Sequence, residues 1–142
     1  MLVSMLPWSN QMLNHRGTEA QRDTLSEKVI GAAITVHRAL GPGLLESAYE
    51  ACLELEIKEL GLRVERQVEV PLHYKTIKLD AGYRLDLLVE RELILELKTV
   101  EKLLAIHQAQ LLTYLKLTGI STGLLMNFHV AKLADGIKRL KL

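Results

Sequence analysis

Cysteine is almost absent from this sequence. The 142 residues include one, Cys52, which cannot form an internal disulfide. Pairs of cysteines or histidines at the spacing of zinc ligands are missing as well. Both absences are typical of proteins in a reducing compartment, and we therefore expect a cytoplasmic protein.

A dominant charge and a long apolar run are also missing. The 18 lysines and arginines nearly balance the 17 aspartates and glutamates, for a net charge of +1. No whole-molecule field therefore draws the chain to nucleic acid or to an anionic membrane, and any such binding must come from a local patch. Residues 1–17 lack the basic leader and the sustained apolar core of a signal peptide, and no window is apolar enough to span a membrane.

What is present is enough apolar material for the core of one domain, because 49% of the residues are hydrophobic. Residues 1–22 show no sustained periodicity and are expected to form a loose leader, which leaves residues 23–142 as the domain. A Thr-x-x-Glu capping box at Thr24 and Glu27 predicts the start of the first helix, and Gly41-Pro42-Gly43 predicts its end.

The remaining chain alternates between helical and strand-like periodicity. The pattern predicts a helix over residues 44–60, a strand over 64–74, a hairpin of two strands over 83–89 and 93–100, a helix over 101–118 and a strand over 123–128. Pro71 favours an edge position or a bulge for the first of these strands. Residues 129–142 fit either a helix or a hairpin that turns at Asp135-Gly136. The order of elements indicates an α/β fold with a mixed sheet.

The expected hairpin carries three charged residues, Asp86, Glu96 and Lys98. Side chains alternate between the faces of a strand, so Glu96 and Lys98 share one face and the flanking leucines point to the other. If residues 90–92 form a three-residue connection, Asp86 lies opposite Glu96 and joins this face. A two-residue turn would place Asp86 opposite Leu95 instead.

Adjacent carboxylates repel each other, and a divalent cation between them relieves that repulsion. Mg²⁺ needs few protein carboxylates and commonly engages phosphate. Lys98 could orient or deprotonate a water, or neutralise charge on a phosphorus centre. The combination predicts metal-assisted hydrolysis of a phosphodiester. The alternative is that Asp86, Glu96 and Lys98 are solvated residues on the open face of an antiparallel sheet.

Glu46 is an acidic residue at the head of an otherwise apolar helical stripe. A carboxylate that points to the packed side must be paired, hydrogen-bonded or bound to a metal, which makes Glu46 a candidate for the same site. Acidic residues in a first helical turn are also favoured by the helix dipole alone. Tyr49, three residues further, fits either core packing or the site.

The helix over residues 101–118 presents His107, Gln110 and Tyr114 along one stripe that runs past the end of the Glu96 strand. Gln110 and Tyr114 could hold a phosphate or support the lysine by hydrogen bonding. His107 could protonate a leaving group or contact phosphate. Semi-buried polar residues at a helix–sheet boundary would give the same pattern.

These motifs together resemble those of the GxxExxY family, within the PD-(D/E)xK nuclease-like superfamily. Residues 43–49 (GLLESAY) match the naming motif, and residues 83–103 (YRLDLLVERELILELKTVEKL) match the nuclease core. Leu85 replaces the proline of the core motif. The resemblance implies a single-domain αβββαβ core with an extra N-terminal helix.

The resemblance also implies the members of the site. Asp86 and Glu96 would bind Mg²⁺ (or Mn²⁺), with help from the backbone carbonyl of Leu97. Glu46 would lie near these acids as a further member of the metal site and would assist the metal or Lys98, and Lys98 would be the catalytic lysine.

Gln110 and Tyr114 further resemble the Gln-x-x-x-Tyr motif of RecB-like nucleases. The expected function is therefore a Mg²⁺-dependent nuclease that hydrolyses nucleic acid, with DNA as the expected substrate. The alternative is a non-catalytic nucleic-acid-binding or partner-docking module on the same fold, which would bind through the basic tail of Lys132, Lys138 and Arg139. Assembly into a homodimer or a larger complex is left open.

Overall fold

The computed structural model describes residues 17–80 and 82–142. Its centre is a mixed sheet formed by β1 (Val64–Glu69), β4 (Arg84–Val89), β5 (Leu93–Lys98), β6 (Thr122–Asn127) and β7 (Ile137–Lys141). The strands lie in the order β1-β4-β5-β6-β7. β5 and β6 run parallel, and the other neighbours in this sheet run antiparallel.

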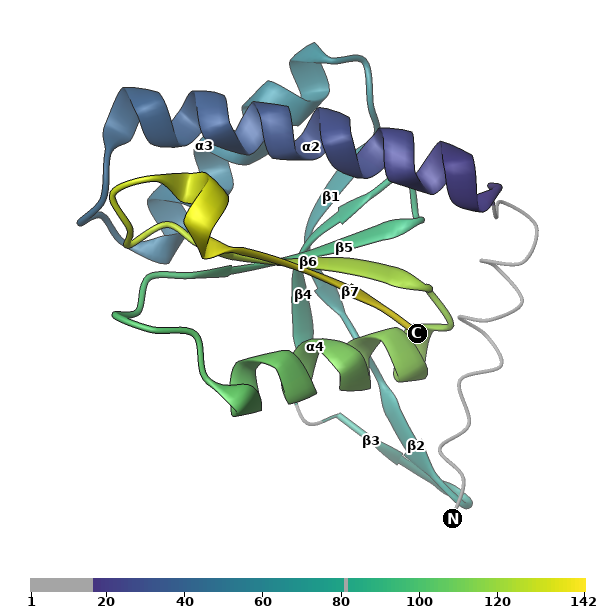
Figure 1. Ribbon diagram of the computed structural model, residues 1–142. Helices are drawn as coiled ribbons and strands as arrows, with labels where there is room; N and C mark the ends of the chain where they lie inside the picture. Colours follow the sequence, from purple (N-terminus) through teal and green to yellow (C-terminus); the bar gives the residue numbers. More distant parts are fainter. Residues whose placement is uncertain (1–16, 81) are drawn as a thin grey trace.

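Helices cover both faces of this sheet (Figure 1). α2 (Glu19–Leu40) and α3 (Glu46–Glu59) pack on one face, and α4 (Ala105–Thr118) packs on the other. Leu95 and Leu97 of β5 point into the core beneath α2 and α3, as the alternation along that strand predicted. The arrangement confirms the expected fold class. No helix in the described part of the chain combines the length and the apolar character needed to cross a membrane.

α2 begins earlier than predicted, so the capping box assigned to Thr24 is wrong. Thr18 is the N-cap: its hydroxyl accepts the Gln21 N–H at 3.1 Å, and the Gln21 side chain accepts the Thr18 N–H at 2.8 Å. Thr24 lies inside the helix, where its hydroxyl donates to a carbonyl one turn earlier. Residues 19–22 therefore belong to α2. Residues 1–16 of the expected leader lie outside the described chain.

The predicted helix stop at Gly41-Pro42-Gly43 is confirmed. Gly41 follows α2 directly and adopts a φ of 70°, which favours glycine. Tyr49 of α3 holds this loop, because its hydroxyl donates to the Gly41 carbonyl and accepts the Leu44 N–H at 3.2 Å. The Tyr49 ring is fully buried and stacks on Phe128, with ring centroids 4.5 Å apart. Tyr49 is thus a core residue that also fixes the start of α3.

The strand predicted over residues 64–74 is broken at Pro71. β1 ends at Glu69, and the chain continues as β2 (Leu72–Tyr74), which pairs with β3 (Ile77–Leu79) in a separate hairpin that was not predicted. Proline has no N–H to donate, so the pairing of β1 with β4 cannot continue through it. β1 lies at one edge of the five-stranded sheet, as Pro71 indicated. The β2–β3 hairpin projects from the sheet on the side of α4 (Figure 1).

The β4–β5 hairpin has the predicted three-residue connection, because Val89 pairs with Leu93 and residues 90–92 form the turn. Of the hairpin alternative for residues 129–142, only the second strand is observed, because the Asp135-Gly136 pair lies in a helical turn and no strand precedes it within the segment. β7 pairs antiparallel with β6 after a short 3-10 helix, η1 (Leu133–Gly136), which contains the Asp135-Gly136 pair.

Two glycines in different settings predict opposite effects of alanine. An ideal Cβ on Gly136 would overlap the carbonyl oxygen of Asn127, so Gly136→Ala should lower the free energy of unfolding by about 1–3 kcal/mol. Gly31 lies in the interior of α2 with nothing within 4 Å of an added Cβ. Gly31→Ala should raise the same quantity by about 0.5–1 kcal/mol. Urea unfolding of both variants checks this, and equal effects would contradict the packing of η1.

Candidate active site

Asp86 and Glu96 meet across the β4–β5 hairpin. Counted from the turn, regular pairing ends at the Leu87–Leu95 pair, which is next to Asp86 on one strand and next to Glu96 on the other. Beyond that point the carboxylates accept backbone hydrogen bonds: Glu96 Oε1 accepts the Asp86 N–H at 3.2 Å, and Asp86 Oδ2 accepts the Leu97 N–H at 2.8 Å. The three-residue connection therefore brings the two acids together, as the register argument predicted.

Both carboxyl groups are withdrawn from water. Glu96 is 5% exposed, and Asp86 is half-buried. Burial raises the pKa of Asp86 to about 6, against the lowering effect of the Leu97 N–H. Burial, and then the charge of Asp86, raise the pKa of Glu96 well above its usual range. The pair therefore retains a proton near neutral pH unless a cation replaces it.

The donor atoms of the pair suit a hard divalent cation. Among the described residues no hydrogen bond reaches Asp86 Oδ1 or Glu96 Oε2, so each carboxylate keeps one oxygen for a ligand. The Leu97 carbonyl points to the same side of β5 as its N–H, toward Asp86, because both groups of an extended residue share one edge of the strand. These are oxygen ligands of the kind that Mg²⁺ takes, with waters completing its shell.

Larger metal-binding clusters are not seen in the described residues. No three aspartate, glutamate, histidine or cysteine side chains there lie in an arrangement that could hold a metal ion. An ion at the Asp86–Glu96 pair would therefore depend on few protein ligands, which is common for Mg²⁺ and unusual for zinc.

Glu46 and Lys98 lie beside the acid pair. Glu46 is the first residue of α3, and its Oε2 accepts the Thr99 N–H at 3.3 Å. Lys98 ends β5, and its charge opposes the rise in pKa of both Asp86 and Glu96. An acid from α3 and a lysine from β5 are thus added to the two strand acids.

A model of the PD-(D/E)XK nuclease superfamily matches residues 23–140, a span that contains the whole cluster. The chain belongs to the PD-(D/E)XK nuclease superfamily. Membership confirms the superfamily that the motifs indicated and points to nuclease activity on nucleic acid. No curated protein and no solved structure matches the chain.

Asn127 holds the backbone that follows the lysine in this member of the nuclease superfamily. Its side chain accepts the Val100 N–H at 3.1 Å and donates to the Val100 carbonyl at 2.7 Å, as a paired strand would. The Phe128 N–H donates to the Lys98 carbonyl at 2.9 Å. Because Asn127 is buried, these bonds fix the direction in which β5 leaves the sheet and hence the position of Lys98.

Glu50 is a buried acid near the pair that the motif analysis missed. It lies one turn after Glu46 on α3 and is 5% exposed. Its Oε1 accepts hydrogen bonds from Arg66 Nε at 2.9 Å and from Gln67 Nε2 at 2.8 Å, and its charge raises the pKa of both strand acids. The i, i+4 spacing from Glu46 was the available signal, because residues so spaced share a helix face.

The three residues of α4 that were predicted to belong to the site divide into two groups. Gln110 and Tyr114 stay together, with Gln110 Nε2 donating to the Tyr114 hydroxyl at 3.3 Å. Burial and the charge of Glu96 raise the pKa of Tyr114, so this tyrosine lies close to the acid pair. His107 caps α4, because its Nδ1 accepts the Leu104 N–H at 2.9 Å.

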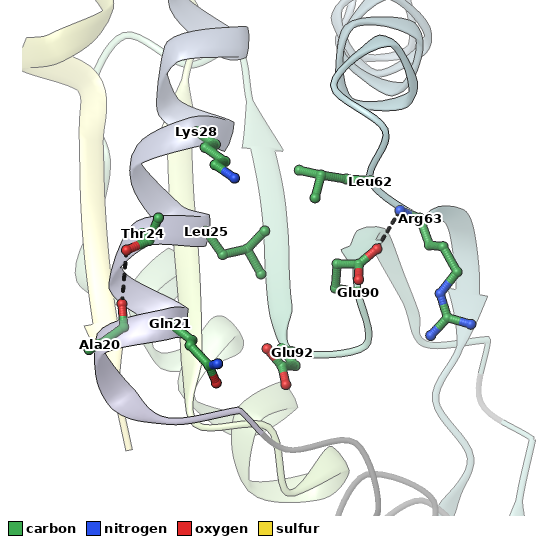
Figure 2. A pocket seen from close by; sticks show the side chains of 9 residues that line it. All are labelled: Ala20, Gln21, Thr24, Leu25, Lys28, Leu62, Arg63, Glu90 and Glu92. Atoms are coloured by element: carbon green, nitrogen blue, oxygen red, sulfur yellow. Dashed lines mark hydrogen bonds between the residues drawn. The ribbon is translucent and has the colours of Figure 1, made fainter.

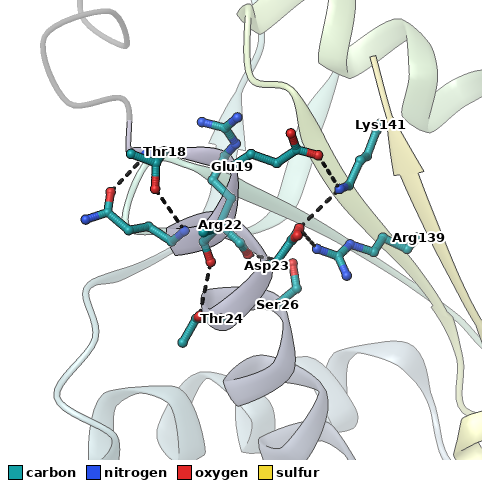
Figure 3. Close-up of polar contacts among 10 residues, drawn as sticks. Thr18, Glu19, Arg22, Asp23, Thr24, Ser26, Arg139 and Lys141 are labelled. Carbon is teal, nitrogen blue, oxygen red and sulfur yellow. Dashed lines mark hydrogen bonds and ion pairs between the residues drawn. The ribbon is translucent and has the colours of Figure 1, made fainter.

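The basic tail is partly neutralised within the molecule (Figure 3). Arg139 and Lys141 of β7 both form ion pairs with Asp23 of α2. Exposed pairs of this kind contribute little to stability, but they reduce the positive charge that the tail presents. Lys132 and Lys138 are exposed. The patch that a purely binding module would use is therefore weaker than the sequence indicated.

A hollow between α2 and the β4–β5 turn contains none of the predicted site residues (Figure 2). Its walls carry two cations, Lys28 and Arg63, and two acids, Glu90 and Glu92. The Glu90 carboxylate is already engaged, since it accepts the Arg63 N–H. The candidate active site therefore rests on the chemistry of the acid pair and not on this hollow.

The pKa of Asp86 predicts a stability cost that depends on pH. Below about pH 4 the carboxyl is largely protonated in both the folded and the unfolded chain, so it does not lower the free energy of unfolding. The pKa rises from 3.8 to about 6 on folding, so between about pH 4 and 6 the unfolded chain loses the proton first. The free energy of unfolding therefore falls over this range and stays lowered above it. Asp86→Asn removes the cost, so at pH 8 in EDTA its free energy of unfolding should exceed that of the wild type by about 2–3 kcal/mol.

Thermal and urea unfolding from pH 4 to 8 measure this difference, which should shrink as the pH falls. The exposed Asp80 provides the matched control, since Asp80→Asn should leave stability nearly unchanged at each pH. A difference for Asp86→Asn that is absent, or that grows toward pH 4, would contradict the assigned environment.

The Glu50 contacts predict a separate structural effect. Glu50→Ala leaves Arg66 and Gln67 without their shared acceptor and should lower the free energy of unfolding by about 1–3 kcal/mol. Glu50→Gln keeps an acceptor oxygen and should cost less. Urea unfolding of both variants, combined with Arg66→Ala in a double-mutant cycle, tests the contact; additive effects of Glu50→Ala and Arg66→Ala would contradict it.

Proposed function

We propose that this chain is a Mg²⁺- or Mn²⁺-dependent nuclease of the GxxExxY family that hydrolyses phosphodiester bonds in DNA. The acid pair is the observation that supports this most. Asp86 and Glu96 are withdrawn from water, have raised pKa values and each keep one oxygen for a ligand, in a member of a nuclease superfamily. Buried like charges are costly for the fold, and a bound cation offsets that cost.

The carboxylates of Asp86 and Glu96 would hold the metal, together with the Leu97 carbonyl. When bound, Mg²⁺ offsets negative charge on the phosphate and lowers the pKa of a bound water. Glu46 would assist from the start of α3, where its carboxylate accepts the Thr99 N–H. In that position Glu46 orients the backbone next to Lys98 and adds negative charge near the cation.

Lys98 is proposed as the catalytic lysine. Its Nζ would orient the attacking water and donate a hydrogen bond to a phosphate oxygen as charge builds there. A long lysine side chain needs a fixed backbone to do this accurately. The bonds of Glu46 to Thr99 and of Asn127 to Val100 supply that support on the residues that follow Lys98.

The polar residues of α4 are proposed to position the substrate. Gln110 is exposed and donates a hydrogen bond to the Tyr114 hydroxyl. Tyr114 lies close enough to Glu96 for the carboxylate to raise the tyrosine pKa. His107 would contact the substrate from the first turn of the helix. We also propose one domain that runs from α2 to β7, in the cytoplasm, where the single cysteine suits a reducing environment.

A cleavage panel tests this function. Purified protein is incubated with single-stranded, duplex and branched DNA and with RNA, in Mg²⁺, Mn²⁺ or EDTA. Cleavage is expected only with metal, and Lys98→Ala and Asp86→Asn should each reduce its rate by roughly 10²–10³-fold. Lys58→Ala is the matched control, because Glu56-Ile57-Lys58 repeats the Glu-x-Lys spacing on helix α3, away from the acid pair.

Cleavage that Lys98→Ala leaves unchanged would contradict the assignment of this lysine. Failure to cleave any substrate, together with salt-sensitive binding of nucleic acid that Asp86→Asn does not alter, would favour the non-catalytic binding module instead.

A further inference from the structure

A second hollow lies next to the acid site, between the β2–β3 hairpin and α4. It has a volume of about 250 Å³ and is lined by Leu72, Tyr83, Gln110, Thr113, Tyr114 and Leu117. The rings of Tyr83 and Tyr114 meet edge to face, with centroids 6.5 Å apart. We call this feature the tyrosine pocket.

The tyrosine pocket is close to the bond-breaking chemistry assigned above. Tyr83 directly precedes β4 and is three residues from Asp86, roughly 10 Å along an extended chain. On the other wall, Tyr114 lies near enough to Glu96 for the carboxylate to raise its pKa. A nucleic-acid strand whose phosphate is bound at Asp86 and Glu96 would therefore bring the adjacent nucleotide to the pocket.

The lining favours a flat, neutral ligand. None of the six lining side chains is charged, so the pocket offers no cation to hold a phosphate. It offers two aromatic rings, two leucines and the amide of Gln110. The Gln110 Nε2 donates to Tyr114, and its carbonyl oxygen accepts no hydrogen bond from the described residues, which leaves one acceptor at the rim. Aromatic walls with a few polar groups are typical of sites where nucleobases stack.

We propose that the tyrosine pocket binds the base of an unpaired nucleotide adjacent to the bond that is cleaved. The inference rests on the proposed nuclease function and names its substrate class. A base inside a duplex is stacked and paired and cannot enter such a pocket without being extruded. The preferred substrates are therefore single strands, frayed ends or branches, and a fully paired duplex is a poor one.

Binding experiments can test the pocket separately from catalysis. The probe is a labelled single strand of about ten thymidines, compared with a blunt duplex, with fluorescence anisotropy as the readout. All variants carry Lys98→Ala in Mg²⁺, so that turnover is blocked. Tyr83→Ala should weaken binding of the single strand by about 5- to 100-fold, the range for loss of one stacking side chain, while Tyr83→Phe should stay within about 2-fold.

The hairpin provides a matched control. Tyr74 is 41% exposed and Tyr83 is 43% exposed, but Tyr74 does not line the pocket, so Tyr74→Ala should leave binding unchanged. Thr113→Phe fills the pocket from the exposed face of α4 and should weaken binding as Tyr83→Ala does. Equal binding by Tyr83→Ala and its parent, equal affinity for blunt duplex and single strand, or no binding of the single strand would each overturn the inference.

The outcomes also separate the inference from the nuclease proposal. Metal-dependent cleavage that requires Lys98, combined with single-strand binding that ignores Tyr83, would leave the nuclease assignment standing and remove the pocket. Single-strand binding that depends on Tyr83, in a protein that cleaves no substrate, would support the pocket and contradict the nuclease assignment.

Discussion

Repulsion between two withdrawn carboxylates, Asp86 and Glu96, is the constraint on which the rest of this site depends. Burial is the largest cause of the raised pKa of each, and the charge of Asp86 adds to the cost of ionising Glu96. One backbone N–H donates to each carboxylate, and the positive charge of Lys98 lies nearby. Both interactions favour the ionised carboxylates. These contacts compensate only in part, since both pKa values stay raised. A site that is incompletely compensated in the free chain is suited to take up a cation.

The surrounding elements hold this arrangement from two sides. On one side, Tyr49 fixes the start of α3 through the Gly41 loop, and Glu50 ties the same helix to edge strand β1. On the other side, Asn127 holds the backbone that leaves β5. Gln67, whose side chain donates to Glu50, adopts a φ of 54°, a conformation that is uncommon for a residue with a side chain. The contacts of Glu50 with Arg66 and Gln67 thus join α3 to the sheet at the residue with this unusual backbone conformation.

The sequence was most informative where a single local rule decides the geometry. The three residues 90–92 determine the register of the hairpin, and register alone determines whether Asp86 meets Glu96. Gly41 and Gly61 follow the ends of helices and adopt a positive φ, which glycine accommodates most readily. A glycine after a helical pattern can be read directly from the sequence. The helix start was less certain because Thr18 and Thr24 both open a plausible capping box, and only the observed Thr18–Gln21 bonds distinguish them.

Features that depend on contacts between distant segments could not be predicted. The sequence around Glu50 is that of an ordinary helical acid, and its role depends on hydrogen bonds from Arg66 and Gln67 of another element. The role of Tyr83 likewise depends on its contact with Tyr114 of α4. The β2–β3 hairpin was hidden because its strands are three residues long, too short for alternation to be recognised. Tertiary packing, and not local preference, supplied each of these.

Calorimetric titration of the metal-free protein with Mg²⁺ tests the central claim most directly, when it is run at pH 7 in buffers of different ionisation enthalpy. If the acid pair retains a proton that the cation displaces, binding will release protons, the observed heat will change with the buffer, and both effects will disappear in Glu96→Gln. Absence of Mg²⁺ binding, or binding whose heat is the same in every buffer and in Glu96→Gln, would contradict the account.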